Sequence, residues 1–537
     1  MKSIFLVVIL MVSGLIYSQQ KLIPLQSFYK DKSLQFSPKK SISTFYPQNE
    51  SELNIHFINR DSSKQYFDLT EYLFKHHLLE LKTDIGQLNI DPIINLSKGR
   101  SNLDTVGYPL LRNTRGIFIE GQVYNKISFQ FTFTENQARF QNYEREYMAS
   151  RGELYFAAKK FIPDSAVFFL KDQLIGYSLQ NAVVPGGSRT KPFKEDGLDY
   201  AYSSGVVNFA VHPKFSIIAG NNRNFIGSGY RSLLLSDNGF LAPNIRFNWK
   251  IHPKIEYQVL YQKNLNLYRK PLTKAVESNY ENKFFALNYL TYKPIPAFSI
   301  SLFSAGNQLL GDSMVYHPFI KDQLIPLPFF QNDFTLGRSN VLNGISGLNL
   351  DLALQKVRIY GQVAIDQVNK VFLVANQLGF YLFDAFKIKN ALLQFEWNQV
   401  PKNFYAEKNP KLAYSHFNLP SAHPKGNNFN ELFLKLFYEK NRFYIQGKTS
   451  IYFTQGGSNL QQFEANSIFN ALTFGKLSYG NTVTGDYELG YRFNRLYNAT
   501  IYIKYQGRSI DYDKIHSTFN CIWFGLKTSL SNEYFDI

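Results

Sequence analysis

The sequence predicts an all-β protein: a transmembrane, antiparallel, up-and-down β-barrel of 16–18 strands with a small helical plug. Three observations predict it: an export signal at the start, apolar residues that alternate with polar ones, and connections that alternate between short and long. Successive side chains of a strand point to opposite faces, so alternation gives a strand one apolar and one polar face. In a membrane barrel the apolar face contacts lipid and the polar face lines the lumen.

The export signal occupies residues 1–18. Lys2 precedes an apolar run, residues 4–16, and the small residue Ser18 follows it, which is the pattern of a cleaved secretory signal peptide. After it, no run approaches the ~20 apolar residues of a membrane-spanning helix. We therefore expect an exported chain that reaches the outer membrane of a Gram-negative-type envelope. The single cysteine, Cys521, excludes an internal disulfide, and we expect it to be a small apolar strand residue.

Composition agrees with strands that are apolar on one face only. The chain has 49 Phe and 36 Tyr and is 45% hydrophobic, yet its mean hydropathy is only −0.24, so apolar side chains are dispersed among polar ones. The net charge of +17 suits phosphate- or carboxylate-rich partners such as outer-membrane lipids, lipopolysaccharide or acidic polysaccharide. Scattered surface lysines explain the charge equally well. Nucleic acid is not expected, because an exported chain rarely meets it.

Alternation is clearest at residues 127–134, where Ile127, Phe129, Phe131 and Phe133 alternate with polar side chains. Six more segments show the same period of two. Their apolar positions are Ile245/Phe247/Trp249/Ile251, Ile255/Tyr257/Val259/Tyr261, Leu348/Leu350/Leu352/Leu354, Leu432/Leu434/Leu436/Tyr438, Tyr487/Leu489/Tyr491/Phe493 and Ala499/Ile501/Ile503/Tyr505.

The spacing of turns separates a membrane barrel from a soluble sandwich. Eight tight turns are expected at 125–126, 212–214, 252–254, 294–296, 355–356, 387–390, 440–441 and 495–498. Long polar connections lie between them, at 138–200, 220–244, 262–283, 305–347, 366–379, 401–430, 451–484 and 507–517. Outer-membrane barrels have short periplasmic turns and long external loops, whereas a sandwich has no reason to alternate. Eight hairpins, an opening strand near 88–96 and a closing strand near 519–528 give the upper count of strands.

Three regions follow: a signal peptide at 1–18, an N-terminal periplasmic or lumen-plugging segment with a helix at 19–86, and the barrel at 87–537. A barrel this wide leaves space that its own side chains do not fill. Residues 68–82 show helical spacing of apolar side chains, so we expect a plug helix there. We expect a second helix within 164–183, around the apolar run 166–170.

Motifs of enzyme chemistry are missing from the sequence, so we expect no enzyme, no cofactor and no metal site. There is no H-E-x-x-H, Cys pair, Walker loop or G-x-S-x-G. His76 and His77 are adjacent, and on a helix they would point about 100° apart, which does not make a two-ligand face.

The segment 221–243 is the most informative stretch without strand character. Gly227 and Gly229 permit sharp backbone turns and are the expected structural glycines. Six other residues form the candidate polysaccharide-binding set: Arg223, Phe225, Tyr230, Arg231, Asp237 and Asn238. Arginines bind carboxylates, Asp and Asn bind hydroxyls, and aromatic rings stack on sugars. The alternative is an Arg–Asp lock that holds the loop in the barrel.

The runs GSGYRSLLLSDNGFLAPNIRF and NTRGIFIEGQVYNKISFQFTFTENQ resemble the Wzi-like capsule assembly proteins. More narrowly, they resemble the RemB-type gliding motility proteins of Bacteroidetes. Gly227, Gly229 and the Ser-Asp-Asn at 236–238 match the family pattern, and the C-terminal third diverges from it. The resemblance implies an 18-stranded barrel with a small helical plug. It also implies a role in holding surface polysaccharide or in gliding, with polysaccharide or gliding-machinery proteins as partners.

Three functions remain open from the sequence. A non-enzymatic surface protein for capsule retention or gliding is the first, an outer-membrane channel or porin is the second, and a lipid- or sugar-modifying enzyme is the third. The enzyme needs a nucleophile or carboxylate beside a His on one face of the barrel, and the sequence has no such spacing.

Overall fold

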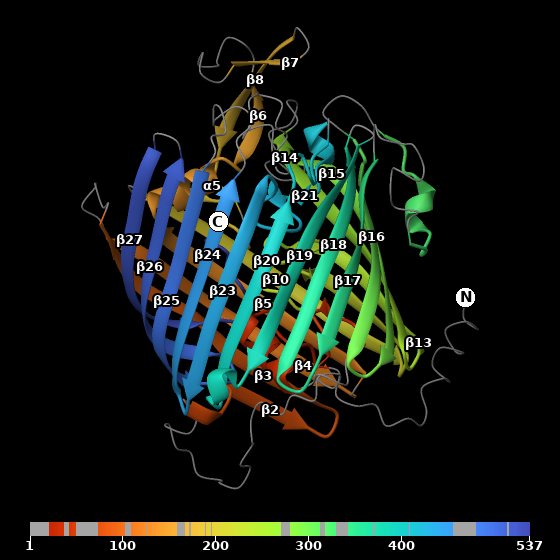
Figure 1. Cartoon of the computed structure of the whole chain (residues 1–537), viewed down its shortest axis with the longest axis vertical. Coiled ribbons are helices and arrows are strands. Elements are labelled where there is room, and N and C mark those ends of the chain that lie inside the picture. Colours follow the sequence, from red (N-terminus) through yellow and green to blue (C-terminus); the bar gives the residue numbers. More distant parts are fainter. Residues whose placement is uncertain are drawn as a thin grey trace.

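The computed structural model contains a closed antiparallel barrel of 18 strands, as the sequence predicts. It describes residues 21–36, 42–49, 74–102, 109–124, 126–157, 167–170, 173–187, 189–194, 196–269, 280–311, 317–328, 342–368, 371–407, 409–454, 480–512 and 515–536. The predicted signal peptide lies outside these residues. Figure 1 shows the tilted strands, with the tight turns at one end and the longer connections at the other.

Each barrel strand pairs with its neighbour in the chain, and the last pairs with the first. The strands are β3 (Gly86–Ser101), β4 (Leu110–Val123), β5 (Ile127–Arg139), β10 (Gly197–His212), β11 (Phe215–Asn222), β13 (Ala242–His252), β14 (Ile255–Arg269), β15 (Tyr280–Ile295), β16 (Phe298–Leu309), β17 (Leu342–Ala353), β18 (Val357–Val368), β19 (Val371–Phe383), β20 (Ala391–Val400), β23 (Phe429–Lys440), β24 (Phe443–Thr454), β25 (Gly480–Asn494), β26 (Ala499–Tyr512) and β27 (Ile515–Thr528). Pairing of β27 with β3, from Lys527↔Asn95 to Cys521↔Ser101, closes the barrel without a free edge.

As predicted, apolar side chains of the strands face outward and polar ones face the lumen. Phe131 and Phe133 are exposed on the outer wall, whereas Ser128 and Thr134 are buried in the lumen. Leu434, Leu489 and Ile503 repeat the outward orientation on other strands. This apolar outer band suits hydrocarbon, and backbone groups are paired around the whole barrel, as a lipid environment requires. Among the helices of the described residues, none has the length and apolar character needed to cross a bilayer.

Two of the long connections predicted from the sequence are wrong. Strand β18 runs to Val368 and β19 starts at Val371, so most of 366–379 is strand. Likewise β26 runs to Tyr512 and β27 starts at Ile515, so 507–517 contains only a short break. In 366–379 the exposed apolar side chains Phe372 and Val374 continue the outer face of β19. The eight tight turns all lie at or within about two residues of their predicted positions.

The helical segments differ from those predicted. Of the helix predicted at 68–82, residues 68–73 lie outside the described residues, residues 74–75 are helical, and the rest contains strand β2 (Leu79–Thr83), which pairs with the start of β3. Alternation of Leu79 and Leu81 with charged residues outweighs the helical spacing there. Within 164–183 the structure has strands β7 (Val167–Leu170) and β8 (Gln173–Gln180), not a helix.

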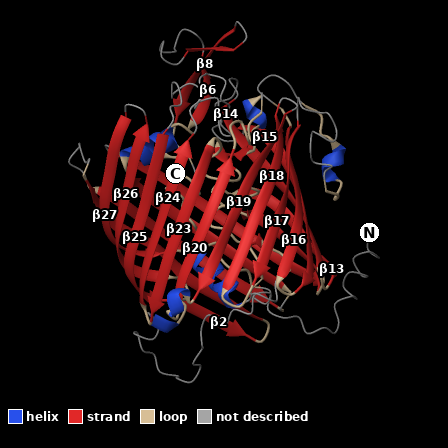
Figure 2. Cartoon of the chain, in the orientation of Figure 1, coloured by secondary structure: helices blue, strands red, loops and turns tan. Residues whose placement is uncertain are grey.

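Helix α2 (Ser27–Phe36) occupies the lumen near the tight-turn end (Figures 1 and 2). Its Leu34 packs against wall residues of β18–β20, including Tyr381 and Leu392. The other α-helix of the described residues is α5 (Asn142–Ala149), which lies at the long-loop end in Figure 1.

Part of the lumen is an apolar core, which differs from the uniformly polar lining expected. Leu233, Leu234 and Leu235 pack against inward side chains of β14–β19 and of the β20–β23 connection. The partners include Phe285, Tyr289, Phe303, Ile345, Phe404, Tyr405 and Tyr414. The barrel interior is therefore partly filled by its own long connections, as in a globular core.

Candidate functional site

The β11–β13 connection, residues 223–241, folds into the barrel, and we call it the inward loop. Residues 224–239 are buried without exception. Within it, strand β12 (Phe225–Ile226) pairs with β1 (Phe45–Tyr46), so an N-terminal strand and the inward loop support each other. The long connection predicted at 220–244 spans only 223–241, because its ends belong to β11 and β13, and most of it is buried in the lumen.

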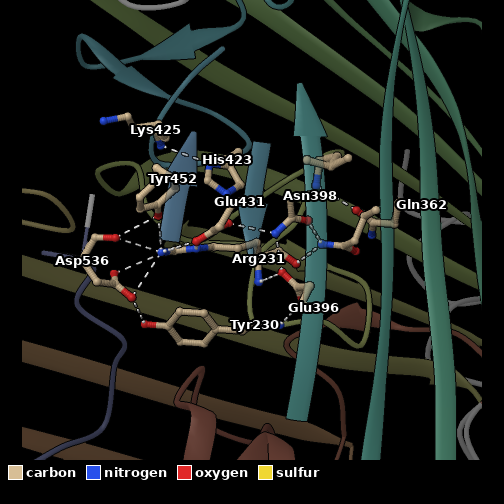
Figure 3. Close-up of polar contacts among 12 residues, drawn as sticks. Tyr230, Arg231, Gln362, Glu396, Asn398, His423, Lys425, Glu431, Tyr452 and Asp536 are labelled. Atoms are coloured by element: carbon tan, nitrogen blue, oxygen red, sulfur yellow. Dashed lines mark hydrogen bonds and ion pairs between the residues drawn. The ribbon is translucent and has the colours of Figure 1, made fainter. Parts of the chain in front are cut away.

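Arg231 is the centre of a charged cluster inside the barrel (Figure 3). Its Nε and Nη2 donate to Glu431 Oε1 at 3.2 and 3.1 Å, and its Nη1 donates to Asp536 Oδ1 at 3.3 Å. Nη2 also donates to the backbone carbonyl of Asp536 at 3.1 Å. Burial lowers the pKa of Arg231, but the carboxylates of Asp536 and Glu431 outweigh it and raise the pKa above its ordinary value. We call Arg231, Glu431, Asp536, Glu396 and His423 the hub.

Glu396, the third carboxylate of the hub, binds backbone N–H groups of the inward loop. Glu396 on β20 accepts hydrogen bonds from the backbone N–H groups of Tyr230 at 2.8 Å and Arg231 at 3.1 Å. The Tyr360 hydroxyl donates to it at 2.9 Å. Because a buried N–H without a partner is costly, Glu396 fixes the path of the inward loop.

The two predicted structural glycines lie where a side chain would not fit. Gly227 has a φ of +112°, and a Cβ there would lie 2.3 Å from Gln362 Nε2. At Gly229 a Cβ would lie 2.5 Å from Glu396 Oε2 and 2.7 Å from the carbonyl oxygen of Arg231. Close approach of the loop to the barrel wall therefore requires glycine at both positions.

Asp237 does not pair with Arg231. Its carboxylate accepts from the Tyr534 hydroxyl at 2.7 Å and from Asn532 Nδ2 at 3.0 Å. Arg223 Nη1 donates to the carbonyl oxygen of Asp237 at 3.2 Å. A lock therefore exists: the carboxylate of Asp237 is held by residues 529–536, the return segment that follows β27, and within 221–243 Arg223 holds only the backbone carbonyl of Asp237.

The remaining members of the predicted set are also buried. Tyr230 stacks on Phe433 with 4.2 Å between ring centroids and donates from its hydroxyl to Asp536 at 3.0 Å. Phe225 has the ammonium of Lys30 4.1 Å from its ring centroid. The amide of Asn238 has no hydrogen-bond partner among the described residues, although it is 1% exposed.

His423 and helix α2 also contact the hub and the inward loop. His423 Nε2 lies 2.7 Å from Glu431 Oε2, and its Nδ1 accepts from the backbone N–H of Lys425 at 3.1 Å. Burial lowers the pKa of His423, so the neutral ring that these bonds require is favoured. From α2, Lys30 Nζ donates to the carbonyl oxygen of Gly229, and burial lowers the pKa of Lys30 to about 8.

Sequence reasoning found Arg231 and Asp237 but missed Glu396, Glu431, His423 and Asp536. The carboxylates on β20 and β23 occupy inward positions of alternating strands, and a charged inward residue is a usable signal. Asp536 gives no such signal, because only the fold brings it to Arg231. No group of three or more His, Cys, Asp or Glu in the described part of the chain could hold a metal ion.

Comparison with known proteins supports the fold. No protein-family model matches the chain. No curated protein matches its sequence. Among solved structures, the chain is similar to Wzi, an outer-membrane protein involved in group 1 capsule assembly in Escherichia coli and described as a carbohydrate-binding β-barrel. The TM-score is 0.52 at 11% identity, over 95% of this chain and 99% of that one.

Porin-like barrels match less well. OprD of Pseudomonas aeruginosa has a TM-score of 0.41 at 9% identity, covering 83% of this chain and 95% of that one. OccAB2 of Acinetobacter baumannii has a TM-score of 0.39 at 10% identity, covering 82% of this chain and 97% of that one. The chain thus has the fold of an outer-membrane β-barrel of the Wzi type.

Proposed function

We propose that this protein is a non-enzymatic outer-membrane barrel that retains or assembles surface polysaccharide. The observation that carries the proposal is the inward loop, which is locked inside the lumen by Glu396, Glu431 and Asp536. A barrel whose interior is occupied by its own connections is suited to holding a polymer at the surface and poorly suited to conducting solutes.

The outward parts of the long connections carry the contact with polysaccharide in this proposal. Arg231, Asp237 and Tyr230 act by holding the inward loop through their hydrogen bonds, and Arg231, Asp237 and Asn238 are at most 1% exposed. Direct sugar binding by Arg231 would need it to leave two carboxylates, which costs several kcal/mol for buried charges.

The two sequence runs that resemble RemB-type proteins support a second role in the same class. In that role the barrel supports gliding over surfaces through partner proteins, again without transport or catalysis. Both roles need a closed and stable barrel in the outer membrane.

A deletion strain tests the proposal. We expect reduced retention of surface polysaccharide in capsule staining, or reduced colony spreading if the gliding role holds. Normal retention together with normal spreading would contradict both roles.

Planar-bilayer recording tests the porin alternative. We expect almost no conductance from the purified protein, because the inward loop and α2 occupy the lumen. Steady ohmic channels from folded protein would favour a porin.

Variants Arg231→Ala and Asp237→Ala separate direct sugar binding from locking. If the two variants keep the heat-dependent gel migration of a folded barrel but lose polysaccharide retention, direct contact with sugar is favoured. Loss of that migration favours the lock. Lys321→Gln, on an exposed loop, is the matched control.

A further inference from the structure

A cavity of about 220 Å³ remains in the lumen beside helix α2. One wall is α2, and the return segment and Tyr230 form another. Barrel residues next to the tight turns also line it, such as Ala391 and Thr500. In outer-membrane barrels this end faces the periplasm. The volume lies just under the ~300–1,000 Å³ of ordinary small-ligand sites, so it matches one or two sugar rings and not a polymer.

Positive charge is in excess around this cavity. Six cationic side chains line it, and they are Lys32, Arg112, Lys448, Arg492, Lys504 and Lys527. Four anionic side chains face them, and they are Asp31, Asp486, Glu488 and Glu533. The cavity therefore favours an anionic ligand over a neutral or cationic one.

Most of these charges are already paired. Lys527 lies 2.6 Å from Glu488, Arg112 lies 3.1 Å from Glu533, and Arg492 lies 2.7 Å from Glu439 just outside the lining. Asp486 is shared, at 3.6 Å from Lys448 and 3.9 Å from Lys504.

Lys32 on α2 is the exception. It has no hydrogen bond or ion pair within the described residues. Burial lowers its pKa, Glu439 raises it, Arg492 and Arg495 lower it, and the neighbouring Asp31 raises it by a smaller amount. A half-buried ammonium among other cations gains from an incoming negative charge. One unpaired ammonium matches a monoanion such as a carboxylate better than a phosphate dianion.

The neutral lining is of the kind that binds sugars. Aromatic rings and amides both face the cavity, and they include Phe28, Tyr202, Tyr444, Asn95, Asn136 and Gln446. Rings pack on the apolar faces of pyranoses, and amides donate to and accept from hydroxyl groups.

We infer that this cavity is a binding site for a carboxylate-bearing sugar unit that enters from the tight-turn end, with Lys32 as the carboxylate-binding residue. The inference rests on the proposed function for its ligand class only. This site lies near the tight turns, whereas the long connections of the proposed function lie at the other end of the barrel.

Calorimetric titration of the full-length folded protein in detergent tests this inference with digalacturonate. The dimethyl ester of the same disaccharide is the matched probe, because it removes only the charge. We expect the acid to bind more tightly than the ester, and the difference to shrink as salt rises. Lys32→Gln weakens binding of the acid about tenfold and abolishes the preference over the ester, because it removes one charge-assisted contact.

Two further variants complete the experiment. Lys504→Gln is a second cavity variant, which leaves Asp486 paired with Lys448, and we expect it to weaken binding of the acid less than Lys32→Gln does. Lys321→Gln, on an exposed part of the β16–β17 connection, is the control. Heat-dependent gel migration shows that each variant is folded.

Three results would overturn the inference. They are equal binding of acid and ester, unchanged binding in Lys32→Gln and Lys504→Gln, and displacement of the sugar by acetate at equal concentration, which indicates an anion site only. No binding of digalacturonate to the folded wild-type protein, together with the loss of polysaccharide retention in the deletion strain, would reject this inference and leave the proposed function intact.

Discussion

Arg231 and Asp536 are 305 residues apart in the chain, yet the Arg231 guanidinium donates to both the carboxylate and the backbone carbonyl of Asp536. Arg231 lies on the inward loop and Asp536 on the return segment that follows the last strand. The pair joins the inward loop to the return segment, together with the hydrogen bonds of Tyr534 and Asn532 to Asp237. Since β27 closes the barrel before the return segment enters it, this contact links barrel closure to the filling of the lumen.

Removal of the Arg231 charge tests the hub. Arg231→Met keeps most of the side-chain volume but leaves Glu431 and Asp536 without their cation. Breaking a buried pair from one side costs about 3–5 kcal/mol. We expect the temperature at which the barrel loses its heat-dependent gel migration to fall markedly. The double variant Arg231→Met/Glu431→Gln should recover part of the loss, and an equal or larger loss would argue against charge pairing as the cause.

The return segment can be tested without changing charge. Tyr534→Phe removes the hydroxyl that donates to Asp237 at 2.7 Å and keeps the ring. Loss of one buried hydrogen bond that leaves a carboxylate partly unsatisfied costs about 1–3 kcal/mol. We expect faster proteolysis of the return segment in the folded barrel. Tyr124→Phe, on an exposed turn, should change nothing.

The close approach of the inward loop to the wall predicts unequal effects of alanine at two glycines. Gly229→Ala places a methyl group against Glu396 and should destabilise the barrel by about 1–3 kcal/mol, as overpacking does. Gly239→Ala is the matched control in the same loop, because a Cβ there meets nothing within 4 Å. Urea unfolding followed by tryptophan fluorescence measures both, and equal midpoints would show that the loop shifts freely.

His416 in the β20–β23 connection predicts a loss of stability in acid. Its Nδ1 accepts from the backbone N–H of Leu265 at 3.0 Å, and its Nε2 lies 3.1 Å from the carbonyl oxygen of Leu241, so the neutral ring fits. Burial lowers its pKa to about 4. The unfolded chain takes up the proton near pH 6.5, and the folded chain resists it. Stability is therefore complete above pH 6.5 and falls toward pH 4, by about 2 kcal/mol at pH 5.

His416→Gln checks the source of that dependence. Glutamine can also accept and donate but does not titrate, so the urea midpoint of the variant should depend less on pH between 7 and 5. His212→Gln, on an exposed tight turn, is the control. An unchanged pH dependence in His416→Gln would assign the effect to other groups.

From the alternation of apolar residues and the tight turns alone, the barrel and most of its strand ends could be predicted. Membrane strands need one apolar face, so Phe131 and Phe133 show in the sequence pattern which way they point. Tight turns have local rules, so Pro213 and Pro253 mark hairpins without knowledge of the rest of the fold. Gly227 and Gly229 marked sharp local turns, but the sequence left open what they approach.

How the lumen is filled could not be predicted from the sequence and is seen in the structure alone. The helix in the lumen is α2, and residues 79–82, predicted to be helical, instead belong to strand β2, which pairs with β3. Asp237 was predicted either to bind polysaccharide or to pair with an arginine of its own segment, and its carboxylate binds the return segment. Residues inside the lumen contact partners hundreds of positions away, and no period in the sequence encodes those distances. Buried Arg231 must pair with the carboxylates that the fold brings near it, because an unpaired buried charge is too costly.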